Sequence, residues 1–134
     1  MHKVFVYGSL LSEMGNHRLL TGSKMLGISR SPKNFAMVDL GYFPGVIIDE
    51  SHPGNVVGEV YEVDDSTLSN LDRLEGYHPT DPKNGLYDRI KINTDFGEAY
   101  IYIYNIRSSR KISFVENGDW RKYFTNKLTN NNDY

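Results

Sequence analysis

The chain of 134 residues contains no cysteine, which excludes disulfide bonds, a thiolate nucleophile and cysteine-based metal clusters. It also carries little net charge, because 15 Lys and Arg residues stand against 17 Asp and Glu residues, for a formal charge of −2. A chain without a basic excess is a poor match for the phosphate backbone of a nucleic acid. We therefore expect no nucleic-acid partner.

Long apolar runs are missing as well. Uninterrupted runs span only a few residues, as in Val46–Ile48, whereas a membrane-spanning helix needs about 20. The segment from Met1 to Gly8 lacks the long apolar stretch and small-residue cleavage site of a signal peptide. We therefore expect no membrane partner and a cytoplasmic location.

The residues that are present fit one globular domain. Charged residues make up 24% of the chain and aromatic residues 13%, and the length is enough to enclose one core. We find no internal repeat and no linker. We expect a single domain over residues 1–128, followed by a polar tail at 129–134 that frays.

Short β-branched and aromatic runs predict strands, and recurring leucines predict helices. Strands are expected at 4–7, 35–40, 46–48, 56–63, 87–93 and 98–104, with a further short extended piece between Gly22 and Gly27. Helices are expected at 12–20, 65–75 and 119–128. The last two strands should form a hairpin around residues 94–97. The sum is an α+β domain of six or seven short strands in a closed or strongly curved sheet, with helices at its side.

The helix expected at 65–75 has clear boundaries. Asp64 or the acid after it can cap its first turn, and Gly76 can end it in a left-handed conformation. Asp72 and Arg73 fall on faces away from the leucines, so we expect both to be solvated.

Glu75 is the first candidate catalytic residue. It lies four residues after Leu71 and seven after Leu68, which places it on the apolar face of the helix. Burial there would raise the pKa of its carboxyl, which suits a general acid or base near neutral pH. The alternative is a carboxylate at the rim of the core, either in water or paired with Arg89.

The turn Tyr7-Gly8-Ser9-Leu10 is the second candidate. A strand ends at Tyr7, Gly8 permits a tight turn, and the backbone N–H groups of such a turn can bind an anion or an oxyanion. Ser9 adds a hydroxyl but lacks the glycine pattern of a nucleophile elbow. The alternative is a plain turn without a ligand.

The histidines and the alternating tyrosines give little indication of a functional site. No two of the four histidines have the spacing of metal ligands, so we expect no metal. Every second residue from Tyr100 to Tyr104 is a tyrosine, a pattern more typical of sheet packing than of a ligand site.

Five short segments between residues 3 and 104 carry a family resemblance. They are Val4-Phe5-Val6-Tyr7-Gly8-Ser9-Leu10, Asn16-His17, Gly58-Glu59-Val60-Tyr61-Glu62-Val63, Leu71-Asp72-Arg73-Leu74-Glu75-Gly76 and Tyr87-Asp88-Arg89. No single segment is specific, but their order and spacing resemble the gamma-glutamylcyclotransferase-like family. Its AIG2-like branch of small gamma-glutamylamine cyclotransferases is the nearest in pattern.

The resemblance implies a fold and a reaction. The fold is a small mixed β-barrel with flanking helices. In the reaction, the α-amine of an L-γ-glutamyl amine or amino acid attacks its own γ-carbonyl, which forms 5-oxoproline and releases the other amine. No cofactor or metal is implied, and a small γ-glutamyl substrate is the expected partner.

The resemblance also implies roles for individual residues. The acid/base glutamate of the family falls on Glu75, and the glycine-turn motif that holds the glutamyl group falls on Tyr7–Leu10. Tyr87 falls on the tyrosine that lines the pocket, and we extend the pocket to Gly41 and Phe43.

Two segments bear on the choice of substrate. Glu13 stands where relatives of the amine type carry glycine, and the loop 78–86 is either a shaped lid over the site or a plain connector. The alternative function is a module that binds a small ligand or a protein in the same pocket without turnover.

Overall fold

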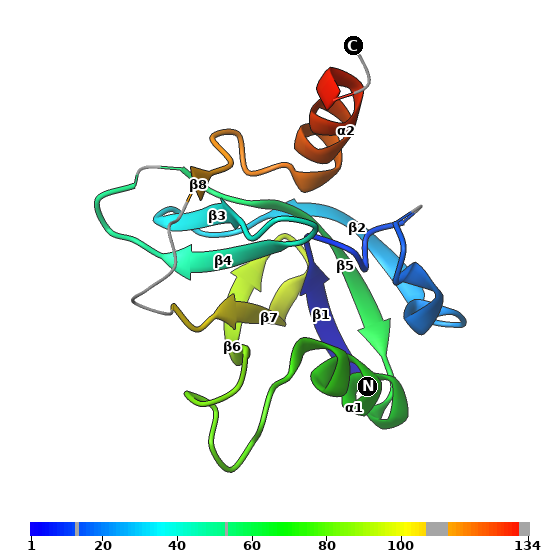
Figure 1. The fold of residues 1–134 in the computed structure, drawn as a ribbon. Coiled ribbons are helices and arrows are strands. Elements are labelled where there is room, and N and C mark those ends of the chain that lie inside the picture. The colour runs from blue at the N-terminus through cyan, green and yellow to red at the C-terminus, as the bar shows by residue number, and fades with distance from the viewer. Residues whose placement is uncertain (13, 53, 107–112, 132–134) are drawn as a thin grey trace.

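The computed structural model describes residues 1–12, 14–52, 54–106 and 113–131, with the backbone alone for 127–131. Eight strands and two α-helices in these residues form an α+β fold, which confirms the predicted class (Figure 1). The strands lie in two sheets, one of five strands and one of three.

The larger sheet places the first strand at its centre. Its members are β1 (His2–Val6), β2 (Lys24–Arg30), β5 (Val57–Val63), β6 (Tyr87–Thr94) and β7 (Gly97–Tyr104), in the order β2-β5-β1-β7-β6. β1 runs antiparallel to β5 and parallel to β7. β6 and β7 pair as the predicted hairpin.

The smaller sheet contains β4 (Pro44–Ile48), β3 (Phe35–Asp39) and β8 (Ser113–Phe114), in the order β4-β3-β8. It packs on the larger sheet through β4 and β7, where a Cβ added to Gly45 would lie only 2.7 Å from the Cβ of Tyr104. Packing at this distance needs glycine. Because no ladder among the described strands joins the sheets, they stay two open sheets and not the expected barrel of six or seven strands.

Val4–Val6, the second half of β1, is buried on both faces of the sheet, which explains why all three of its residues are apolar. Val4 and Val6 belong to a core cluster that contains Leu71 of the first α-helix. Phe5, on the opposite face, belongs to a second cluster that contains Trp120 of the last helix. The turn that follows β1 is therefore anchored by the core on both sides of the sheet.

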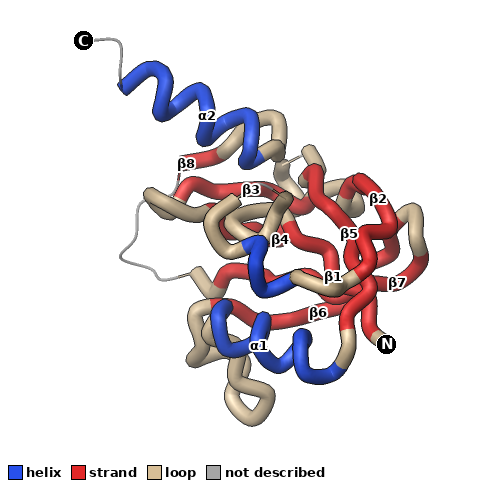
Figure 2. Tube along the Cα trace, turned by 90° about the vertical axis from the view of Figure 1, so that its right-hand side faces the viewer, coloured by secondary structure: helices blue, strands red, loops and turns tan. Residues whose placement is uncertain are grey.

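Helix α1 (Asp65–Glu75) begins and ends where the sequence predicts. The side chain of Asp64 accepts a 2.8 Å hydrogen bond from the N–H of Thr67, and Gly76 ends the helix with φ of 64°. Helix α2 (Trp120–Asn131) lies at the opposite end of the molecule from α1 in both views (Figures 1 and 2).

Two helical predictions differ from the structure. Among the described residues of the segment 12–20, the helix is only the short 3-10 helix η1 (His17–Leu20), and tight turns closed by the N–H groups of Met14 and His17 precede it. α2 continues three residues beyond the predicted end at residue 128. The expected domain limits, with a frayed tail from 129, stay a prediction. No helix in the described ranges combines the length and apolar character needed to cross a membrane.

Replacing Asp64 by alanine removes the cap acceptor of α1, so we expect Asp64→Ala to lower the free energy of unfolding by about 1 kcal/mol. Urea denaturation followed by circular dichroism measures this change. Asp64→Ser keeps an oxygen acceptor and should retain most of the stability. Equal losses in the two variants would show that the cap does not stabilise the helix.

Candidate active site

A pocket of about 280 Å³ opens where the turn after β1, the end of α1, the start of β4 and the start of β6 come together. Such a cavity, formed from four segments far apart in the sequence, has the size to hold a small molecule. Its lining residues are Phe5, Val6, Tyr7, Gly8, Ser9, Leu10, Asn16, Tyr42, Phe43, Pro44, Leu74, Glu75, Leu86, Tyr87 and Tyr102.

Most of the predicted site residues meet in this pocket. Those that line it are Tyr7, Gly8, Ser9, Leu10, Phe43, Glu75 and Tyr87. Gly41 does not: it is exposed, its φ is 110°, and its N–H donates to the side chain of Asp39 at 2.7 Å. Gly41 therefore shapes the loop that leads to the pocket and does not line it.

The carbonyl groups of the turn are occupied. The Gly8 carbonyl accepts a 3.0 Å hydrogen bond from the N–H three residues later, and the Ser9 carbonyl accepts one of 2.8 Å from Asn16. The Leu10 carbonyl lies 3.0 Å from Nδ1 of His17. The N–H groups of Ser9 and Leu10 have no acceptor within the described residues, so both can donate to a carboxylate or an oxyanion.

Gly8 and Asn16 fix the shape of this turn. A Cβ added to Gly8 would lie 2.7 Å from Cγ of the Pro44 ring, a distance that real Cβ contacts do not reach. The side chain of Asn16 donates a 2.9 Å hydrogen bond from Nδ2 to the Ser9 hydroxyl. The turn is therefore held against β4 before any ligand arrives.

Glu75 is the last residue of α1 and the only charged residue among those that line the pocket. Its neighbours on the helix face, Leu68 and Leu71, are buried, as the spacing predicts. Part of the Glu75 residue reaches solvent, yet burial of its carboxyl raises the pKa to about 7. Both protonation states are then populated near neutral pH, which suits a group that must take up and release protons.

Arg89 does not pair with Glu75. Its Nη1 donates instead to Asp72 at 2.6 Å, and the Tyr102 hydroxyl donates to the other oxygen of the same carboxylate at 2.7 Å. The prediction that Asp72 is solvated is therefore wrong, because a cation and a phenol from the sheet enclose it. Within the described residues Glu75 has no ion pair and no hydrogen bond, so nothing offsets its burial.

Tyrosines form the rigid wall of the pocket. The Tyr7 hydroxyl donates to the carbonyl of Tyr102 at 2.6 Å, and the Tyr87 hydroxyl donates to the carbonyl of Pro44 at 2.6 Å. Burial, together with nearby Tyr87 and Glu75, raises the pKa of Tyr7 well above its usual range. Tyr7 therefore stays neutral at physiological pH and does not act as a base.

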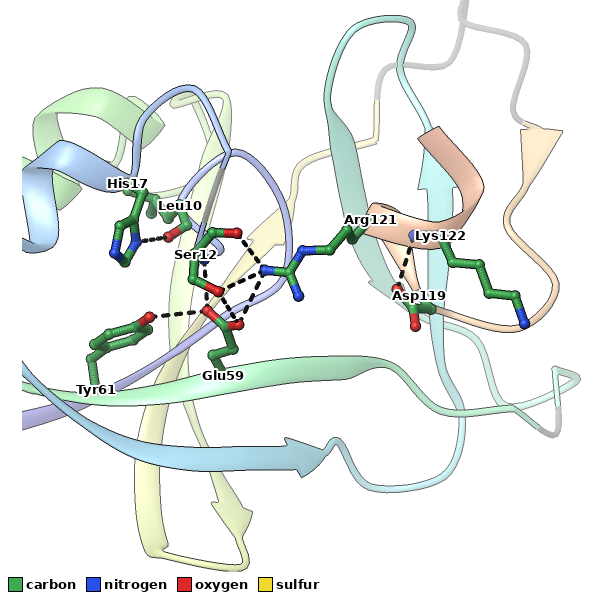
Figure 3. Close-up of polar contacts among 8 residues, drawn as sticks. All are labelled: Leu10, Ser12, His17, Glu59, Tyr61, Asp119, Arg121 and Lys122. Atoms are coloured by element: carbon green, nitrogen blue, oxygen red, sulfur yellow. Dashed lines mark hydrogen bonds and ion pairs between the residues drawn. The ribbon is translucent and has the colours of Figure 1, made fainter. Parts of the chain in front are cut away.

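A buried carboxylate outside the pocket anchors the far end of the same turn. Both oxygens of Glu59 accept 2.8 Å hydrogen bonds from Ser12, one from its N–H and one from its hydroxyl (Figure 3). Tyr61 donates to Glu59 at 3.0 Å, and Nη2 of Arg121 in α2 lies 3.1 Å from it and 2.5 Å from the Ser12 carbonyl. Burial alone would raise the pKa of Glu59, but the hydrogen bonds outweigh it and lower the pKa, so the group stays ionised.

Sequence reasoning missed several lining residues. Leu74 precedes Glu75, and Leu86 precedes β6, so both adjoin predicted site residues. Tyr102 belongs to the tyrosine alternation that we assigned to packing, whereas its place in the pocket shows that it also forms the wall. Asn16 belongs to a segment that carries the family resemblance, but we assigned it no role from the sequence, and it lines the pocket.

The loop 78–86, which we expected to influence substrate choice, contributes little to the pocket wall. From the loop 78–86 only Leu86 lines it, and Asn105 Nδ2 holds the loop by donating to the carbonyls of Pro82 and Gly85 at 2.8 Å each. These contacts favour a connector over a lid. Glu13 lies outside the described residues. In the described ranges no group of three or more His, Asp or Glu side chains could hold a metal ion.

Comparison with known proteins places these features in a family. The family model "Gamma-glutamyl cyclotransferase, AIG2-like" matches residues 4–122. A Vibrio cholerae relative that carries a gamma-glutamylcyclotransferase name is 43% identical over 119 residues, which are 89% of this chain and 95% of the relative. The solution structure of YtfP from Escherichia coli is 35% identical, covers 91% of this chain and 98% of its own, and has a TM-score of 0.67. A Niallia circulans relative named gamma-L-glutamyl-butirosin B gamma-glutamyl cyclotransferase is 33% identical over 92% of this chain and 78% of its own length.

The contact between Gly8 and Pro44 makes the turn sensitive to a single methyl group. We expect Gly8→Ala to displace the turn and to weaken ligand binding in the pocket by at least tenfold, because the proline ring cannot rotate away. Gly15→Ala is the matched control, since a Cβ there meets nothing within 4 Å. Titration calorimetry with 5-oxoproline measures the dissociation constant of each variant. Equal binding by the Gly8 and Gly15 variants would contradict the claim that the Gly8–Pro44 contact fixes a ligand-binding turn.

The raised pKa of Glu75 predicts a pH-dependent cost in stability. Between about pH 4.5 and 7 the folded chain binds more protons at Glu75 than the unfolded chain, so stability falls as pH rises through this range. Glu75→Gln removes this pH-dependent contribution to the free energy of unfolding. We expect the variant to gain on the order of 1–3 kcal/mol relative to wild type between pH 4.5 and 8, a value reduced for the partial exposure of the residue.

Chemical denaturation of both proteins at pH 4.5 and pH 8 measures this gain. A stability difference between wild type and variant that is independent of pH would show that the carboxyl is not desolvated.

Proposed function

Because the chain belongs to the gamma-glutamyl cyclotransferase, AIG2-like family, it is an enzyme of the gamma-glutamylcyclotransferase type, and we propose that it converts an L-γ-glutamyl amine or amino acid to 5-oxoproline and the free amine. One observation supports this reaction more than any other. Glu75, without a partner in the described residues, lines the same pocket as the N–H groups of the Gly8 turn.

The reaction needs few catalytic groups because the nucleophile and the electrophile belong to one molecule. The α-nitrogen attacks the γ-carbonyl carbon, a C–N bond forms, and an oxyanion develops on the carbonyl oxygen. The bond to the leaving nitrogen then breaks. Holding the substrate in the folded shape that permits this attack can itself supply several kcal/mol.

Glu75 has the role of proton carrier. The α-ammonium nitrogen begins with three hydrogens and ends with one in the lactam, whereas the leaving nitrogen begins with one and ends as an ammonium with three. Two protons therefore move between the nitrogens, with no net uptake. A carboxyl whose pKa is about 7 can accept and release them in turn.

The turn has the role of anion binder. The N–H groups of Ser9 and Leu10 donate to the glutamyl carboxylate or to the developing oxyanion, and their geometry is set before binding because Asn16 and Pro44 hold the turn. Donors fixed in this way stabilise charge that appears only in the transition state. Tyr87 and Phe43 complete the wall. The cytoplasmic location stays a prediction.

We expect Glu75→Gln to lower kcat for 5-oxoproline formation at least 100-fold while the fold persists, because the amide is the same size but cannot carry a proton. Chromatographic detection of 5-oxoproline from a panel of γ-glutamyl amines and dipeptides measures turnover, and circular dichroism checks the fold. Glu62→Gln, at a glutamate of β5 that does not line the pocket, is the control and should leave kcat unchanged. Full turnover in Glu75→Gln would rule out the mechanism. Binding without product in wild type would instead assign a non-catalytic module.

A further inference from the structure

Large apolar side chains gather at the mouth of the pocket. Tyr42, Phe43, Leu74 and Leu86 line it with exposed fractions of 89%, 37%, 39% and 40%. These are four of the ten large apolar residues that are exposed in the described part of the chain, and they come from three separate segments. We call these four residues the apolar rim. Exposed apolar residues that converge from separate segments mark a binding surface more often than a chance pattern.

The deeper part of the pocket is already suited to the glutamyl group. Tyr7, Leu10 and Tyr87 are buried, and the free N–H groups of the turn and the Glu75 carboxyl belong to this part of the lining. A substrate whose glutamyl end binds there directs its leaving amine toward the apolar rim.

Charge restricts what that leaving amine can carry. Among the residues that the structure describes, the lining includes no Lys, Arg or His, so a carboxylate on the leaving group would find no cation in this wall and would share the cavity with Glu75. Three described guanidinium groups near the pocket already have acceptors: Arg89 binds Asp72, Arg121 binds Glu59, and the exposed Arg18 donates to the Gly15 carbonyl at 3.0 Å and to Oδ1 of Asn16 at 3.5 Å. Arg73 faces a separate groove beyond α1. A carboxylate left without a partner beside another carboxylate is disfavoured.

We propose that the preferred leaving group is an uncharged aromatic or branched alkyl amine seated on the apolar rim, and not an amino acid. This inference rests on the proposed cyclotransferase reaction and defines its substrate class. Contact with the rim offers selectivity of the size that apolar pockets usually give, about 10- to 200-fold for a gain of a few carbon atoms.

Three substrates test the proposal. They are γ-glutamyl-phenethylamine, γ-glutamyl-phenylalanine, which differs from it by one carboxylate, and γ-glutamyl-methylamine, which lacks the ring. We expect kcat/KM for 5-oxoproline formation to be at least ~10-fold higher for the phenethylamide than for either of the others. Leaving-group chemistry alone would favour the phenylalanine compound over the phenethylamide, because phenylalanine is the less basic amine, so this comparison reports on the pocket. Methylamine is the more basic amine and the poorer leaving group, so the comparison with the methylamide reports on the pocket only through the rim variants below.

Rim variants provide the second measurement. Tyr42→Ser and Leu86→Ser should reduce the preference for phenethylamide over methylamide several-fold, mainly through a higher KM for the phenethylamide. Both residues are exposed, so neither change empties the core. Ile48→Ser is the matched control: Ile48 is a similarly exposed apolar residue of β4, at 54%, that does not line the pocket. It should leave the preference unchanged.

The outcomes separate the two proposals. If all three compounds form 5-oxoproline but the methylamide or the dipeptide reacts as well as the phenethylamide, the leaving-group inference is overturned and the cyclotransferase reaction stands. A preference for the phenethylamide that stays unchanged in Tyr42→Ser and Leu86→Ser overturns the inference as well. If none of the three yields 5-oxoproline, the proposed reaction itself fails.

Discussion

The pairing of Arg89 with Asp72 determines the chemistry of the pocket. Asp72 lies one helical turn before Glu75 and Arg89 lies on the adjacent sheet, and the two charges neutralise each other at 2.6 Å. Tyr77 and Tyr100 enclose the guanidinium, at 4.8 and 4.3 Å from its carbon, which holds it in place. Glu75 has no Lys, Arg or His beside it among the described residues that line the pocket, and burial raises the pKa of its carboxyl to about 7. An Arg89 that turned toward Glu75 would hold the carboxyl ionised and remove its capacity to carry protons.

The second constraint is the stiffness of the turn after β1. Core packing on both faces of β1 fixes where the turn begins, and Pro44 presses against Gly8 where any side chain would collide. Asn16 and His17 then hold its middle through the Ser9 and Leu10 carbonyls. The carbonyls of Gly8, Ser9 and Leu10 have partners, whereas the N–H groups of Ser9 and Leu10 have no acceptor in the described residues and remain open to a ligand. Preorganised donors of this kind cost little reorganisation during a reaction.

Much of the fold and part of the site could be predicted from the sequence. Local signals sufficed for α1, whose cap at Asp64 and end at Gly76 depend on neighbouring residues, and the face of Glu75 followed from helical spacing. Contacts between residues far apart in the sequence could not be predicted. No local pattern near Asp72 indicates that it pairs with Arg89, and the arrangement of the two sheets depends on the packing of Gly45 against Tyr104. The exposed leucines of the apolar rim were missed for the same reason, since only the fold brings them to one mouth.

The hydrogen bonds around Glu59 connect the turn after β1 to α2, because Arg121 contacts Ser12, which precedes it by 109 residues. During synthesis the N-terminal turn leaves the ribosome long before the residue that clamps it. The turn acquires this support only after Arg121 has been synthesised, more than 100 residues after Ser12. Nascent chains that do not yet include Arg121 therefore lack a part of what holds the turn in place.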